Sequence, residues 1–596
     1  MFTGILLLGS CEKTLDAPTK SSLEEKVIFS TPRLAEGSIA GILQSFGETN
    51  SYRGRFLVFY GTNTDVEVFN SLKSYEDDKA RLSNYNTNAN NGQMNTDNNV
   101  WAKLYEGIER ANLAIRGLRM YGDVQNNAEL GQILGEILTL RAVMYSDLIK
   151  GWGDVPARFE PITSETQYLP RSDKDVIYKQ LLADLDEAAG LLPWPNETSV
   201  TSSVERVNKA FAKGLRARIA LYAGGYSQRS DGSIRLSNDP DLERSKMYEI
   251  AKKECLEIIQ ENRLKLLGYE EVFRKLNEES TVAGLESMWE IPFSEGRGRV
   301  IFDLGVKHET VDKYTGQNKG GTVGPNPLML YEYDKDDVRR DVSVVPYKWK
   351  DGIQEPSGLS TLYFGKYRYE WMKRKVTSTN DDGLNWMYMR YADVLLMAAE
   401  AVNEIDGASA AAPYLKKILE RAFPANSSKV TEIMNTATAS EDAFLSEIMR
   451  QRALEFCGEM LRKADLIRWN RLSTNLTQAK EKLEALEGRS SYTERNSGLP
   501  DRVIRYNLLP NKIYYKTLAD GESVEIYGLN FGDTDTQGAS LGYTSETSWK
   551  LTGDKDTEAY WNCLFRKDPN THQVWPIWQV FIDSSNGQLN NDGYNF

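Results

Sequence analysis

The sequence has few of the residues that build metal and nucleophilic centres, with two histidines and four cysteines among 596 residues. The cysteines are Cys11, Cys255, Cys457 and Cys563. None of them stands in a CxxC or comparable spacing, so neither a zinc site nor a disulfide framework is predicted. His308 and His572 have no GxSxG pattern beside them and are expected to be loop or packing residues. We therefore expect no metal and no cofactor.

An excess of positive charge and long hydrophobic runs are also absent. The chain has 72 Lys and Arg against 85 Asp and Glu, a formal net charge of −13. An acidic surface repels nucleic acid and anionic lipid, so neither is expected as a main partner. No segment has the roughly 18 apolar residues in a row that a membrane-spanning helix needs. Aromatic residues are plentiful, with 31 Tyr and 12 Trp, and such rings serve in cores and in ligand contacts.

The first residues, MFTGILLLGSCEK, resemble a bacterial lipoprotein signal. A short apolar run is followed by two small residues and Cys11, which is the order of a lipobox, whose Cys is acylated and becomes the first mature residue. We expect a partial signal over 1–10, a lipidated Cys11 with a tether over 11–30, and one domain over 31–596. Acyl chains would hold the protein on a membrane at roughly 0.8 kcal/mol per buried methylene.

Hydrophobic periodicity predicts consecutive amphipathic helices. The first has one apolar stripe at alternating spacings of three and four, formed by Trp101, Leu104, Ile108, Ala111, Ile115 and Leu118. Further helices are expected near 137–148, from an N-cap at Ser172 to 192, and over 207–222, 241–262, 386–405, 411–423 and 441–472. Short Gly and Pro breaks separate them, as in stacked tetratricopeptide hairpins.

Two stretches between and after these helices have a different texture. Residues 265–385 and 473–596 are rich in Gly, Asp, Asn and aromatics, with a few short strand-like runs such as 287–292. The predicted fold is mainly α: a tetratricopeptide-like array of helical hairpins, mainly 31–262 and 386–472, with long irregular loop excursions and a few short strands. Excursions of this length on a rigid frame usually carry function.

Two segments combine apolar residues with charges of both signs, RYADVLLMAAEA at 390–401 and QRALEFCGEMLRKADLIRW at 451–469. Arg390 and Asp393 are three residues apart and are expected to pair. Glu455 and Glu459 could form an acid/base pair or belong to an ion-pair network between helices. We favour the network, because buried charges need partners and the sequence supplies both signs in register.

These two segments strongly resemble the SusD/RagB family of Bacteroidetes outer-membrane lipoproteins. Matching segments follow in family order: WAKLYEGIERANLAI, LTLRAVMYSDLIKGWGDVP, VNKAFAKGLRARIALYAG and the C-terminal VWPIWQVFIDSSNGQLNNDGYNF. The resemblance covers nearly the whole chain from Cys11. It implies a lipid-anchored protein on the outer face of the outer membrane that is not an enzyme. Such a protein captures oligosaccharide and delivers it to a partner SusC-like TonB-dependent transporter.

Sugar binding needs aromatic faces for the C–H surfaces of the rings and polar side chains for the hydroxyl rim. Two loop stretches, 60–88 and 312–371, combine both kinds of residue. The candidates in the first are Asp65, Asn70, Tyr75, Asp78, Arg81 and Tyr85. Those in the second are Tyr314, Trp349, Tyr367 and Trp371, with Tyr333 and Tyr363 as further rings. For any one ring, packing inside the protein is the more common role.

Two other functions stay open at this point. A glycoside hydrolase using two carboxylates is one alternative, because 85 acidic residues always allow a pair to be chosen. A helical-repeat scaffold that binds peptides would share the same helical pattern. A lipidated Cys11 would argue against the scaffold, and a turnover assay on oligosaccharides separates binding from hydrolysis.

Overall fold

The computed structural model describes residues 24–70, 76–378, 382–495, 498–551, 562 and 564–594. The predicted lipidation site Cys11, most of the tether and the candidate Tyr75 lie outside these residues. Within the described ranges, no helix is both long and apolar enough to cross a membrane.

The N-terminal half is a series of helices in which each long helix packs on the next. They are α1 (Glu25–Ser30), α2 (Pro32–Ala35), α3 (Gly37–Leu43), α6 (Val100–Tyr121), α7 (Ala128–Trp152), α8 (Lys174–Leu191), α9 (Lys209–Ala223) and α10 (Arg244–Glu261). Asparagine side chains cap α6, α7 and α9 by accepting a backbone N–H of the first turn. The cap of α8 is Asp173, one residue later than the predicted Ser172.

The second helical region packs on the first through α10 and α15. It contains α15 (Tyr391–Asp406), α16 (Ala408–Ala422), α17 (Ser427–Ala437), α18 (Glu441–Glu455), α19 (Arg462–Arg468) and α20 (Leu472–Glu487). Two predicted boundaries are wrong. The helix expected from 386 begins as a strand, β8 (Trp386–Arg390). The helix expected over 441–472 is broken after α18, where Gly458 and Met460 adopt positive φ angles of 86° and 58°.

The remaining elements are short and lie mostly in the loop-rich parts. The strands are β1 (Glu67–Phe69), β2 (Ser227–Gln228), β3 (Ile234–Arg235), β4 (Ser287–Ile291), β5 (Val323–Pro325), β6 (Tyr347–Lys350), β7 (Ile353–Pro356), β8, β9 (Ser491–Glu494), β10 (Arg502–Arg505), β11 (Lys512–Thr517), β12 (Val524–Tyr527) and β13 (Ser545–Ser548). All pair antiparallel, in sheets of two or three strands. The short helices are α4 (Leu57–Phe59), α5 (Asp78–Ser83), α11 (Tyr269–Asn277), α12 (Val300–Leu304), α13 (Met329–Glu332), α14 (Arg340–Ser343), α21 (Gln537–Ser540) and α22 (Gln579–Ser584).

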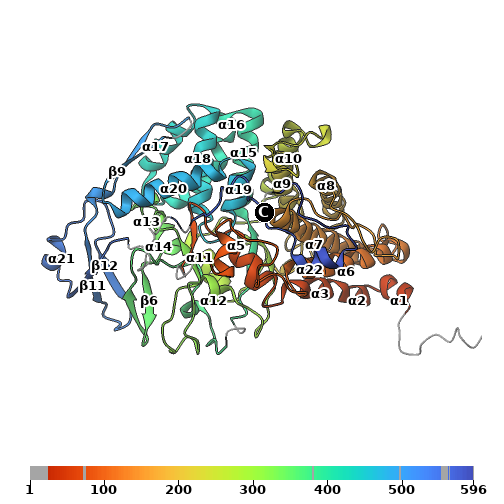
Figure 1. The fold of residues 1–596 in the computed structure, drawn as a ribbon, viewed down its shortest axis with the longest axis horizontal. Coiled ribbons are helices and arrows are strands. Elements are labelled where there is room, and N and C mark those ends of the chain that lie inside the picture. The colour runs from red at the N-terminus through yellow and green to blue at the C-terminus, as the bar shows by residue number, and fades with distance from the viewer. Residues whose placement is uncertain are drawn as a thin grey trace, which may run out of the picture.

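The arrangement confirms the predicted mainly α fold with irregular excursions. In Figure 1 the helices α6, α7 and α8 occupy one side of the molecule, and the strands β6, β9, β11 and β12 occupy the other. The strand β4 confirms the strand-like run expected from 287, and it pairs with β8. The excursions also contain helices that periodicity did not predict, α11 and α20 among them.

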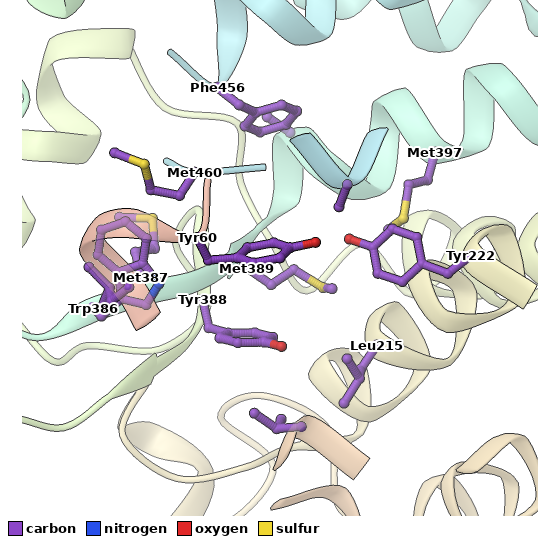
Figure 2. Packing of buried hydrophobic residues seen from close by; sticks show 14 of the residues in the cluster. Tyr60, Leu215, Tyr222, Trp386, Met387, Tyr388, Met389, Met397, Phe456 and Met460 are labelled. Carbon is purple, nitrogen blue, oxygen red and sulfur yellow. The ribbon is translucent and has the colours of Figure 1, made fainter. Parts of the chain in front are cut away.

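One large cluster of buried hydrophobic side chains extends from Phe29 to Trp578 and joins segments far apart in the sequence. Figure 2 shows its centre, where side chains of β8 lie beside Tyr60 and the hydroxyls of Tyr60 and Tyr222 of α9 point toward one another. Phe456, from the turn after α18, belongs to the same cluster and lies on the other side of Tyr60 from Tyr388 in this view. Side chains of the loop-rich segments therefore belong to the same hydrophobic core as the helices.

Candidate functional site

The two candidate loop stretches meet in the structure. Strand β1 pairs with β5, with Val68 opposite Gly324. Directly after β1, the Asn70 backbone N–H donates to the carbonyl of Thr322 at 3.0 Å, and its side-chain Nδ2 donates to the carbonyl of Leu362 at 3.0 Å. A Cβ on Gly324 would lie 2.2 Å from that Leu362 oxygen, so only glycine fits here. This junction fixes 60–70 against 312–371.

The polar candidates of the first stretch mainly hold their own loop in place. Asp65 makes a two-pronged ion pair with Arg462, at 2.7 and 2.8 Å. Burial raises the pKa of Asp65, but the Arg462 guanidinium outweighs this effect and leaves that pKa below its usual value. Asp78 accepts the Gly92 N–H at 2.7 Å, and Arg81 pairs with Glu76 at 2.6 Å.

Most of the candidate rings lie inside the protein. Five of them are at most 4% exposed: Tyr85, Tyr333, Trp349, Tyr363 and Tyr367. The Tyr367 hydroxyl donates to the carbonyl of Gly458 at 3.0 Å. Trp349 packs in a small separate cluster with Val306, Val345 and Tyr363. These rings support the loops from within.

Two candidate rings stay partly exposed. Tyr314 packs against the edge of the Trp349 cluster, with the Lys313 ammonium 5.0 Å from its ring centroid. Trp371 contacts two guanidinium groups, those of Arg274 and Arg368, at 4.5 and 4.4 Å. Of the aromatic candidates with a described position, these two can offer ring surface to a ligand without repacking the interior.

A group of cationic side chains lies near the junction, to which Asp303 links it by pairing with Arg299 and accepting a hydrogen bond from Thr322, and the sequence reasoning missed it. We call it the cationic surface; its members are Arg53, Arg55, Lys79, Arg297, Arg299 and Lys319. They come from a π-helical turn (Tyr52–Phe56), from α5, from the segment that leads into α12, and from the loop before β5. Figure 1 shows α5 and α12 close together below the centre of the molecule. A π-helical turn is rare and is often found at functional sites.

Arg299 connects these elements. Its Cδ lies 3.9 Å from the position that a Cβ on Gly54 would take, so its stem packs on the π-helical turn. Its guanidinium lies 3.9 Å from the ring centroid of Phe302, and the ammonium of Lys319 lies 5.4 Å from the same centroid. Among the described residues its ion-pair partner is Asp303, at 3.4 Å, which also accepts a hydrogen bond from Thr322 at 3.1 Å.

The cations of this surface lower the pKa values of one another by electrostatic repulsion. The pKa of Arg53 is lowered to about 10: burial is the main cause, Arg299 and Arg297 add to the shift, and Asp382 acts against it. Burial also lowers the pKa of Lys79, with Arg55, Arg299 and Lys319 adding to the shift. Burial raises the pKa of Asp382 to about 7, which reduces the negative charge available to the group near neutral pH.

A sequence signal for this surface existed. Two Arg-Gly-Arg motifs occur, Arg53-Gly54-Arg55 and Arg297-Gly298-Arg299. In both, the glycine allows close packing: a Cβ on Gly298 would lie 2.0 Å from an Asp382 carboxylate oxygen. The motifs are far apart in the chain, and only the fold brings them together.

The charged pair Glu455 and Glu459 is structural, as favoured from the sequence. Arg390 binds Glu459 through two hydrogen bonds and also contacts Glu455 and Glu286, all in the interior. Arg390 does not pair with Asp393 as expected. It precedes the helix in extended conformation, and Asp393 pairs with Arg218 and Arg452 at 2.6 Å each.

Comparison with known proteins agrees with this architecture. Residues 286–594 match the SusD family, and residues 49–221 match the family described as starch-binding associating with outer membrane. SusD-like proteins P25 and P38 of Formosa agariphila are 23% and 25% identical to this chain. The matches cover 77% and 78% of the chain and 87% and 89% of the relatives.

Solved structures share the fold. A SusD homologue of Bacteroides thetaiotaomicron gives a TM-score of 0.67 at 20% identity, covering 78% of this chain and 91% of that one. Surface glycan-binding protein A of the same organism, solved in complex with laminarihexaose, gives 0.61 at 18% identity, covering 94% and 99%. The SusD match alone spans more than half of the sequence. This chain therefore belongs to the SusD family, which is made of non-catalytic glycan-binding proteins.

Proposed function

We propose that the protein binds an oligosaccharide at the surface around the β1–β5 junction. The observation that carries this proposal is the junction itself, which holds the two candidate stretches together on a packed frame. Cationic hydrogen-bond donors from several loops lie near the junction, and Tyr314 and Trp371 of the second stretch are partly exposed, which supports the proposal. Donors and ring surface together suit a sugar, which has a hydroxyl rim and apolar faces.

We further propose that the bound oligosaccharide passes to a SusC-like TonB-dependent transporter, with the protein anchored in the outer membrane through an acylated Cys11. Membership of the SusD family supports this role. The rigid helical half leaves the loop-rich half free to contact ligand. Mass spectrometry of the N-terminus and co-purification from detergent-extracted outer membranes would test the anchor and the partner.

A glycan array probed with the purified full chain tests the binding function. We expect retention of at least one class of oligosaccharide, and recovery of that oligosaccharide uncut after prolonged incubation. Cleaved products would support the glycoside hydrolase alternative. Binding of peptides, with no binding to any oligosaccharide on the array, would favour the helical-repeat scaffold and defeat the proposal.

A further inference from the structure

The cationic surface brings together several cations that have no carboxylate partner among the described residues. Elsewhere even deeply buried arginines have carboxylate partners, as Arg339 has Asp337 at 2.7 Å and Arg141 has Asp184 at 2.7 Å. Within the part of the chain that the structure describes, no carboxylate lies within ion-pair distance of five members of the cationic surface. Those five are Arg53, Arg55, Lys79, Arg297 and Lys319. In a chain of net charge −13, a local excess of unpaired cations calls for an explanation.

Packing does not explain the excess, because holding like charges together destabilises the folded protein. Arg53 is 2% exposed, and its Nε and Nη1 have no hydrogen-bond partner among the described residues. Burying such a group costs free energy, and unlike Arg339 and Arg390 it has no carboxylate partner among the described residues. The nearest opposing charges are few, namely Asp303, Glu48 and the partly neutral Asp382. A bound anion beside the surface would offset the repulsion without needing to touch Arg53.

The members that can make direct contact have the chemistry of an anion site. Lys79, Arg297 and Lys319 are exposed, and Arg55 and Arg299 are half-buried. The Arg299 guanidinium is oriented by Phe302 and by the contact with Gly54, so little side-chain entropy remains to be lost on binding. A planar guanidinium pairs with carboxylate or sulfate through two parallel hydrogen bonds.

We propose that the ligand of the cationic surface is an anionic oligosaccharide, one whose sugar rings carry carboxylate or sulfate groups. The inference rests on the proposed function, that this region binds oligosaccharide. The exposed lysines and arginines pair with the acidic substituents. Residues of the neighbouring loops bind the hydroxyls and the apolar faces of the sugar rings. A flat anionic membrane is a poorer fit, because a membrane faces a wide area of the protein and the chain as a whole has a net charge of −13.

Calorimetry on the full chain with three probes tests the inference. The probes are a galacturonic acid hexamer, a sulfated galactose hexamer and neutral laminarihexaose. We expect at least one acidic probe to bind about tenfold or more tightly than laminarihexaose in low salt, and to lose most of that advantage at about 500 mM NaCl. The two acidic probes distinguish a carboxylate from a sulfate ligand.

A double variant locates the effect. Lys79→Gln with Lys319→Gln removes two exposed charges that are repelled by their neighbours, so the fold should be kept and the melting temperature should not fall. Binding of the preferred acidic probe should fall about tenfold or more, while binding of the neutral probe should fall by a much smaller factor, because its hydroxyls lose hydrogen bonds but no ion pair. The matched control is Lys335→Gln with Lys417→Gln. It removes two exposed lysines for which no ion pair is found in the described structure, and should leave both affinities unaltered.

The outcomes separate the two proposals. If laminarihexaose binds as well as both acidic probes, the anionic inference is overturned and the oligosaccharide function stands. If an acidic probe binds with equal affinity to the Lys79/Lys319 variant and to the wild type, the cationic surface is not its site and the inference is again overturned. If no probe binds but vesicles containing phosphatidylglycerol do, the surface docks on lipid and both proposals are lost.

Discussion

Arg390 and Glu459 are joined by two hydrogen bonds inside the protein, from Nε to Oε2 at 2.9 Å and from Nη2 to Oε1 at 2.8 Å. The same carboxylate accepts the Lys366 ammonium at 2.6 Å. Burial raises the pKa of Glu459, but Arg390 and Lys366 outweigh it and keep the pKa below its usual value. A general acid needs a raised pKa and access to substrate, so this carboxylate is suited to hold β8 against the turn after α18.

Removing that carboxylate should therefore cost stability. Glu459→Ala leaves Arg390 and Lys366 buried without this partner, and we expect a loss of about 3–5 kcal/mol in the free energy of unfolding. Urea denaturation followed by circular dichroism measures it. Glu432→Ala serves as control, because Glu432 is an exposed residue of α17 whose ion pair with Lys429 should contribute about 1 kcal/mol or less. Equal stability of the two variants would contradict the network interpretation.

The β1–β5 junction should not tolerate a side chain at Gly324. An alanine Cβ there would lie 2.2 Å from the Leu362 carbonyl oxygen and 2.3 Å from Asn70 Nδ2. We expect Gly324→Ala to lower stability by about 1–3 kcal/mol, because backbone must move to make room. Gly358→Ala is the control, since nothing lies within 4 Å of its added Cβ. Thermal melts of both variants give the comparison, and identical melting temperatures would show that the junction is looser than described.

Two tryptophans of the second stretch should respond differently to truncation. Trp349 is 3% exposed in the small cluster, so Trp349→Ala should lower stability by about 3–5 kcal/mol, contrary to what its loop position in the sequence suggests. Trp371 is half-buried, so Trp371→Ala should lose about 1 kcal/mol or less from its two guanidinium contacts.

The same pair tests the role of Trp371 in binding. If its ring stacks on sugar, Trp371→Ala should weaken binding of the oligosaccharide found on the array by about 1–3 kcal/mol, by analogy with base stacking. Calorimetry measures this affinity at a temperature at which both the variant and the wild type are fully folded. An unchanged affinity would leave Tyr314 as the described candidate ring with exposed surface.

The sequence predicts an element of the fold where burial gives that element a distinct hydrophobic periodicity. Helix α6 buries one face, so its apolar residues recur every three to four positions and were found. Strand β8 is buried on both sides, and such a continuous apolar run cannot be told from a helix by period, so the sequence pattern wrongly extends the following helix back to residue 386. The break at Gly458 interrupts a segment whose charged and apolar spacing still looks helical.

The site was predicted in part for a similar reason. Loop composition pointed to the two stretches that the β1–β5 junction brings together, but it could not tell buried rings from exposed ones, because both kinds stand among polar residues. The cationic surface depends on contacts between Arg-Gly-Arg motifs at 53–55 and 297–299, which no local pattern connects. Contacts between segments far apart in the sequence determine which rings are buried and bring the two Arg-Gly-Arg motifs together.

A lysine in the core should make stability depend on pH. Lys463 is 3% exposed, and its ammonium lies 4.8 and 4.7 Å from the ring centroids of Tyr60 and Tyr85. Among the described residues it has no carboxylate partner; Arg81 and His572 line the same small cavity. Burial lowers its pKa from 10.5 to about 7, although the two ring faces offset part of the cost of its charge.

The sign follows from proton counting. Between about pH 7 and 10.5 the unfolded chain holds a proton on Lys463 that the folded protein does not, so this residue makes stability rise with pH across that window. Below pH 7 the folded protein carries the full penalty. Lys463→Met removes it, and we expect the variant to exceed wild type by about 2–4 kcal/mol at pH 6, with the difference shrinking toward zero near pH 10.

Urea unfolding at pH 6, 8 and 10 measures this difference, with Lys417→Met as the control. Lys417 is exposed on α16, so its replacement should shift stability by a small amount that does not change with pH. If Lys463→Met were less stable than wild type at every pH, the rings of Tyr60 and Tyr85 would stabilise the charged amine by more than burial destabilises it. The ammonium of Lys463 would then stabilise the contact between α19 and the loops that contain Tyr60 and Tyr85, and it would stay protonated at physiological pH.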